Sequence, residues 1–155
     1  MKNEHSMERE RVHAAEALLS EVMELTDAGK VKSKLKQVEE KYEADPSELN
    51  SIRLGIIHHE VALNLGLLAK TTYKGYALRS YERLTDLEAA LKAKEFLPFV
   101  ASYRASALTL VGADTRKLSM VGDAFRLFEA AVERYGDISY LPEFLRGSVA
   151  ENLPW

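Results

Sequence analysis

Residues 45–69 read DPSELNSIRLGIIHHEVALNLGLLA, and this stretch decides the class of fold. Asp45 can cap a helix, Pro46 suits a first helical position, and Glu48 stands where a capping box places a carboxylate. We therefore predict a helix over residues 46–69. Its apolar residues fall on almost every side, which is typical of a helix covered by several neighbours. They are Leu49, Ile52, Leu54, Ile56, Ile57, Val61, Ala62, Leu63, Leu65, Leu67 and Leu68.

Outward from this stretch, helical spacing of apolar residues recurs along the whole chain. It predicts helices over residues 7–27, 31–44, 75–94, 96–111, 115–135 and 140–153. We expect Gly29 and Gly112 to end helices and Asp114 to begin one. Ala, Leu, Glu, Lys and Arg supply 80 of the 155 residues, a composition rich in helix formers. Short connections favour antiparallel neighbours, so we predict an all-α protein of about seven helices and no sheet.

A short pattern of an apolar or aromatic residue, an arginine, and a small residue two positions later recurs in three helices. It reads Ile52-Arg53-Leu54-Gly55, Tyr103-Arg104-Ala105-Ser106 and Leu145-Arg146-Gly147-Ser148. The recurrence predicts one domain of three stacked helical hairpins, over residues 30–69, 75–112 and 114–153, with residues 1–29 as an N-terminal cap. The small residues at the end of each copy are expected to let helices approach closely.

Residues 53–62, RLGIIHHEVA, resemble the first helix of a tetratricopeptide repeat, with Leu54 and Gly55 as its Leu-Gly pair. Ala77 and Tyr81 have the spacing of the small and aromatic residues in the second helix of that repeat. The resemblance covers about residues 30–153. It implies a TPR-like α-solenoid, a superhelix of helix pairs whose concave face binds peptide segments of partner proteins.

Arginines occupy the matched positions of the three pattern copies, as Arg53, Arg104 and Arg146. An arginine on a largely apolar helix has to find a partner or face a wet groove. One interpretation is a row of guanidinium groups, with Tyr103 beside them, that binds the carboxylates of an acidic partner peptide. The alternative is internal pairing with a glutamate of a neighbouring helix, such as Glu60 or Glu88.

Several classes of function are disfavoured by composition and motifs. The chain has no cysteine, so thiolate metal sites, disulfides and cysteine nucleophiles are excluded. Residues 58–60 (HHE) lack the i, i+4 spacing of helical metal ligands, and no nucleophile or phosphate-loop motif is present. The net charge of −3 argues against nucleic acid. We find no apolar run near 20 residues and no signal peptide, and therefore expect a cytoplasmic protein without a membrane partner, cofactor or metal.

Cations and aromatic residues are mixed between residues 70 and 83. The residues are Lys70, Tyr73, Lys74, Tyr76, Arg79, Tyr81 and Arg83. Such a mixture can stack nucleic-acid bases, but it also suits a loop and helix start whose tyrosines pack while their hydroxyl groups stay in water. The negative overall charge favours the second interpretation.

We therefore expect a non-catalytic scaffold that binds a partner peptide or protein in a helical-repeat groove. A small-molecule sensor with its ligand between hairpins is the alternative, and an enzyme on an all-α frame is a third. An open groove lined by arginines would favour peptide binding, and a closed apolar pocket would favour a small ligand. Two carboxylates whose pKa values are shifted in opposite directions would favour an enzyme. A homodimer is compatible with the uncapped last helix before residues 153–155 (LPW).

Overall fold

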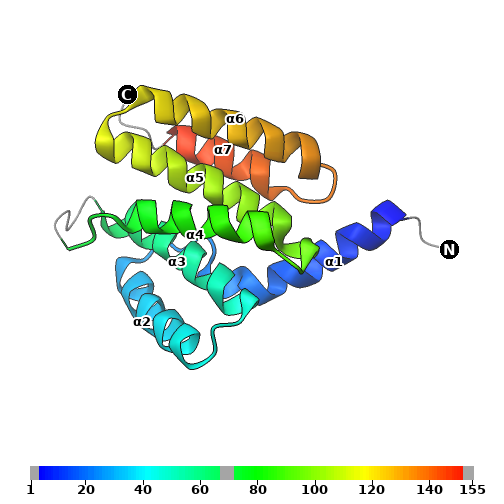
Figure 1. The fold of residues 1–155 in the computed structure, drawn as a ribbon, viewed down its shortest axis with the longest axis horizontal. Coiled ribbons are helices and arrows are strands. Elements are labelled where there is room, and N and C mark those ends of the chain that lie inside the picture. Colours follow the sequence, from blue (N-terminus) through cyan, green and yellow to red (C-terminus); the bar gives the residue numbers. More distant parts are fainter. Residues whose placement is uncertain (1–3, 67–71, 152–155) are drawn as a thin grey trace.

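The computed structural model describes residues 4–66 and 72–151, and every regular element in them is helical (Figure 1). The helices are α1 (Glu4–Leu19), α2 (Ala28–Ala44), α3 (Glu48–Leu65), α4 (Tyr76–Ala90), α5 (Leu97–Thr115), α6 (Leu118–Tyr135) and α7 (Leu141–Glu151). Two 3-10 turns, η1 (Ser20–Val22) and η2 (Lys94–Phe96), precede α2 and α5. The prediction of an all-α protein with seven helices is confirmed for this part of the chain.

The helices after α1 pack on their neighbours in sequence order. Helices α2 and α4 both pack on α3, while α4 and α6 both pack on α5. Helix α5 also contacts α3 and α7. Figure 1 shows this stack, with α6 and α7 at one end and α2 at the other. A hairpin of two amphipathic helices cannot cover its own apolar face, so stacking supplies the shared core.

Helices α3 and α5 are the most buried elements, as their apolar composition predicts. The side chains of Ile52, Ile56 and Phe99 are fully buried, and Tyr103 is 0% exposed. The segment Lys94–Thr115 is long and apolar enough to cross a membrane by those two criteria alone, which corrects the expectation that no run approaches this length. Because 78% of the 18-residue apolar window in this segment is buried inside the fold, the segment serves here as a core helix.

Several predicted helix ends are wrong. Helix α3 begins at Glu48, and Ser47 is its cap, because the Ser47 hydroxyl accepts the backbone N–H of Asn50 at 3.1 Å. Gly29 lies inside α2, which Asp27 caps by accepting the N–H of Lys30. Local capping signals compete within a few residues, and the side chain that reaches the free N–H groups decides the start.

The predicted end at Gly112 and the predicted cap at Asp114 are wrong for a different reason. Helix α5 continues to Thr115 and closes with Arg116 in the left-handed region, at φ 56°. A Cβ atom at Gly112 would lie 2.8 Å from Cγ2 of Val121 on α6. This glycine therefore serves close packing between α5 and α6 and does not stop the helix.

The small residues of the repeated pattern differ in their roles. Gly55 is a close-approach position, because a Cβ atom there would lie 2.6 Å from Cδ2 of Leu84 on α4. Ser106 is fully buried and faces α3. The expectation for Gly147 is wrong, since an added Cβ atom would meet no atom within 4 Å.

The N-terminal helix does not pair with α2 as an antiparallel neighbour. Helix α1 contacts η2, and Arg9 donates from Nε to the carbonyl oxygen of Asp137 at 2.9 Å. The predicted helix over residues 7–27 ends at Leu19, and the chain continues through η1 into a non-helical stretch. The N-terminal segment thus lies against the turn before α5 and the connection between α6 and α7.

Candidate functional site

Arg104 is paired inside the molecule. Its Nη1 lies 2.7 Å from Oε2 of Glu88 on α4, and its Nε donates to the hydroxyl of Thr85 at 3.0 Å. Its guanidinium group also stands 5.8 Å from the centre of the Tyr81 ring. The alternative of internal pairing with Glu88 is therefore confirmed for this arginine.

The other members of the predicted row engage different elements. Arg53 is buried and forms an ion pair with Glu21 of η1, whereas Arg146 lies 3.8 Å from Glu143 on its own helix. Tyr103 is fully buried, and burial together with the nearby carboxylate of Glu60 raises the pKa of its hydroxyl. The three arginines thus have no common partner, and none of them lines the groove described next. The contacts of these three arginines therefore do not form a single row of free guanidinium groups.

A groove of about 640 Å³ lies between α2 and α4, with α3 as its floor. Its lining includes Tyr42 from the end of α2, residues 46–48 and Ser51 from the start of α3, and His58 further along α3. The opposite wall comes from α4. It consists of Arg79, Glu82, Arg83, Asp86, Leu87 and Ala90. The groove exists because α2 and α4 pack on the same helix from different sides.

Two arginines of α4, one turn apart, stand over aromatic rings. The guanidinium carbon of Arg79 is 4.6 Å from the centre of the Tyr76 ring, and that of Arg83 is 4.8 Å from the centre of the Tyr42 ring. Arg83 also donates to the hydroxyl of Ser51 at 2.9 Å. Neither arginine has a carboxylate partner among residues 4–66 and 72–151. Both keep N–H groups for a ligand.

His58 adds a buried polar group to the groove. It is 7% exposed, and its Nδ1 has no hydrogen-bond partner among the described residues. Its ring meets the Tyr76 ring edge to face, with centres 5.2 Å apart. Burial and the charges of Arg83 and Arg79 lower the pKa of His58 to about 4. The imidazole is therefore neutral at pH 7.

The groove also contains carboxylates, and one of them already has a structural role. The two oxygens of Glu48 accept the backbone N–H groups of Lys92 and Ala93, each at 2.9 Å. These two hydrogen bonds lower the pKa of Glu48. Glu48 therefore ties the start of α3 to the loop after α4, and its acceptor capacity is largely used.

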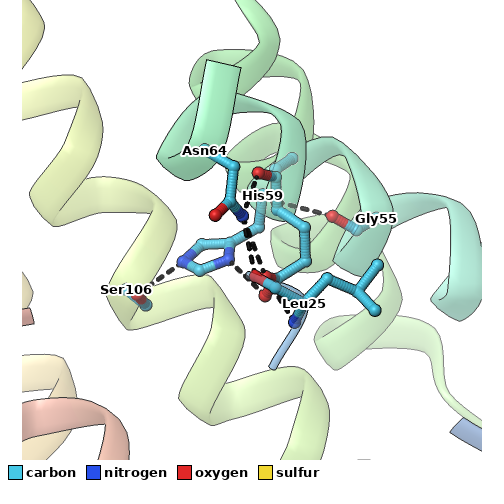
Figure 2. A network of polar contacts seen from close by, with 7 residues as sticks. Leu25, Gly55, His59, Asn64 and Ser106 are labelled. Atoms are coloured by element: carbon cyan, nitrogen blue, oxygen red, sulfur yellow. Dashed lines mark hydrogen bonds and ion pairs between the residues drawn. The ribbon is translucent and has the colours of Figure 1, made fainter. Parts of the chain in front are cut away.

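A second polar cluster lies in the core, between α3 and α5 (Figure 2). His59 Nε2 is 2.6 Å from the hydroxyl oxygen of Ser106, and His59 Nδ1 is 3.2 Å from Oε1 of Glu60. This order of hydroxyl, imidazole and carboxylate matches a nucleophile with its base and orienting acid. However, the three residues are 0%, 1% and 2% exposed, so no substrate reaches the hydroxyl in this conformation.

Part of the groove was visible in the sequence. Tyr76, Arg79 and Arg83 belong to the mixed cation and aromatic cluster, whereas Lys70 of that cluster lies outside the described residues. The contributions of Tyr42 and His58 were missed, because they come from other helices. His58 and His59 also diverge, one toward the groove and one toward α5.

No protein-family model, no curated protein and no solved structure matches this chain, so the resemblance to tetratricopeptide repeats stays a prediction.

Proposed function

We propose that this protein is a non-catalytic interaction scaffold that binds an acidic segment of a partner protein in the groove between α2 and α4. The observation that carries the proposal is the pair Arg79 and Arg83, stacked on tyrosine rings and without carboxylate partners among the described residues. Guanidinium groups without carboxylate partners form an anion-binding surface.

The stacking prepares both arginines for binding. A guanidinium group that lies on an aromatic ring has lost part of its side-chain freedom before a ligand arrives, so less entropy is lost on binding. Its N–H groups then point outward in the plane, where a carboxylate can accept two of them. The neutral ring of His58 adds a polar group to the lining of the groove.

The shape of the groove favours a peptide over a small molecule. It runs along the side of α4 from residue 79 to residue 90, about three helical turns. Its lining mixes charged, polar and apolar residues of separate helices, and the groove is open and not a closed apolar chamber. The resemblance of α3 to a tetratricopeptide helix supports the same class of ligand.

The test is selection of peptides from a random 16-residue display library by the full chain. We expect the selected peptides to be rich in Asp and Glu. Their binding should weaken about tenfold or more in Arg79→Ala and in Arg83→Ala, because each loses one charge-assisted contact. Binding should also weaken as salt is raised.

Arg126→Ala is the matched control, since Arg126 is an exposed arginine of α6 with an ion pair to Asp123. This variant should bind the selected peptides like the wild type. Peptides that bind equally well to the wild type, Arg79→Ala and Arg83→Ala would refute the proposal, provided that circular dichroism shows all three proteins folded.

A further inference from the structure

A non-helical stretch of the chain lies on α3 in the manner of a bound peptide. Residues 23–27 connect η1 to α2, with Met23 in the extended region at φ −95° and ψ 147°. Glu24 follows in the left-handed region, at φ 54°. Because this stretch makes no repetitive hydrogen bonds of its own, its backbone groups need partners elsewhere.

Two side chains of α3 bind both backbone groups of one residue in this stretch. Oε2 of Glu60 accepts the N–H of Leu25 at 3.2 Å, and Nδ2 of Asn64 donates to the carbonyl oxygen of Leu25 at 2.9 Å (Figure 2). Glu60 and Asn64 are one helical turn apart, and Asn64 is held in place by a 2.8 Å hydrogen bond to the Glu60 carbonyl oxygen. These two hydrogen bonds from Glu60 and Asn64 recognise a peptide backbone and not a particular side chain.

The side chains before Leu25 add selectivity. Val22 and Met23 are 0% and 6% exposed and belong to the core. About two turns before Glu60 on α3, the buried Arg53 pairs with Glu21. The surface of α3 from Arg53 to Asn64 therefore binds an acidic residue at one end and the backbone of Leu25 at the other, with the core residues Val22 and Met23 between them in the chain.

The segment of residues 21–25 fits this surface with two unfavourable features, and both belong to Glu24. Glu24 adopts a positive φ that side-chain-bearing residues seldom take. Burial and the charges of Glu16 and Glu60 raise the pKa of its carboxyl group. A segment that has glycine at that place avoids both penalties, because glycine adopts a positive φ freely and has no carboxyl group.

We propose that the Arg53–Asn64 surface of α3 is a second peptide-binding surface, which residues 21–25 occupy in the free protein. Its external ligand is an unfolded protein segment with an acidic residue, an apolar pair and a backbone that can bind Glu60 and Asn64. Binding of that segment displaces the N-terminal segment from α3. The proposal is independent of the groove between α2 and α4, which lies on other residues.

The probe is a fluorescent peptide of residues 16–27, titrated into the full chain and followed by anisotropy. In the wild type, the tethered segment competes at an effective concentration of about 1 mM. In Glu21→Arg, the tethered segment loses its ion pair with Arg53, so the peptide should bind about tenfold more tightly than to the wild type. Glu39→Arg is the matched control, because Glu39 is an exposed residue of α2.

A charge exchange makes the test specific. A peptide with arginine in place of Glu21 should bind weakly to the Glu21→Arg chain and regain affinity for an Arg53→Glu chain. If either charge reversal prevents folding, Glu21→Gln removes the charge alone and should still strengthen peptide binding relative to the wild type. Equal peptide affinity for the wild type, Glu39→Arg and the folded Glu21 variants overturns the proposal. Loss of this binding in Arg79→Ala would also overturn it, because the peptide would then occupy the other groove.

Discussion

The contact between α3 and α4 at Gly55 permits a sharp test of the packing. The perturbation is Gly55→Ala, which adds one methyl group where an ideal Cβ atom lies 2.6 Å from Cδ2 and 2.9 Å from Cγ of Leu84. Leu84 is 0% exposed, so its side chain cannot turn into solvent. Ser80 also donates its hydroxyl to the Gly55 carbonyl oxygen at 2.7 Å, which holds the two helices at this distance.

The magnitude follows from two opposing effects. Overpacking of a buried contact costs about 1–3 kcal/mol, while replacing glycine by alanine inside a helix gains about 1 kcal/mol. Gly147→Ala in α7 is the matched control, because its added Cβ atom meets nothing within 4 Å. The control should therefore show the gain alone, and Gly55→Ala should be less stable than it by about 1–3 kcal/mol.

The assay is urea unfolding followed by circular dichroism at 222 nm, with thermal melts as a second measurement. A difference of this size shifts the melting temperature by roughly 2–4 °C per kcal/mol in a protein of this length. If the two alanine variants gain stability equally, the close approach of Gly55 and Leu84 does not exist and the reasoning is refuted.

Three further variants test the ion pairs and the buried histidine. Arg104→Ala should lower the free energy of unfolding by about 1–3 kcal/mol, because it leaves Glu88 half-buried without its partner, and a change below 0.5 kcal/mol would contradict this. Glu48→Gln should destabilise the wild-type fold by about 1 kcal/mol at pH 7. Since the pKa of Glu48 is lowered on folding, that difference should shrink as the pH falls below 4.5 and vanish once Glu48 is protonated in the folded protein, as chemical denaturation can measure. The pKa of His58 is about 4 in the fold and 6.5 as a free side chain, so the unfolded chain binds more protons between these values. Wild-type stability should therefore fall as the pH is lowered from 7 to 4, and His58→Gln should remove that part of the loss.

The helical class and the burial of two helices could be predicted from the sequence. The 3.6-residue spacing of apolar side chains is a local property, and it identified α2 to α7 within a few residues. The dense apolar composition of α3 and α5 predicted that both would be covered on several sides. The repeated pattern predicted a close approach of helices at Gly55, and the short distance to Leu84 confirms it.

The partners of polar side chains could not be predicted in this way. Arg53 and Arg104 occupy equivalent positions of a repeated pattern, yet one pairs with Glu21 and the other with Glu88. The choice depends on which neighbouring element carries a carboxylate within reach, and that is set by how the helices pack. The non-helical conformation of residues 23–27 has the same origin, because Glu60 and Asn64 bind the backbone of Leu25.

The candidate groove shows where sequence reasoning ends. Tyr76, Arg79 and Arg83 lie close together in sequence, so their mixed chemistry was recognisable. Tyr42 and His58 join them only because α2 and α4 pack on α3. Spacing along the chain is enough to predict which segments form helices and which faces are buried. The contacts between side chains of different helices depend on packing between segments far apart in sequence, so they become known only from the folded protein.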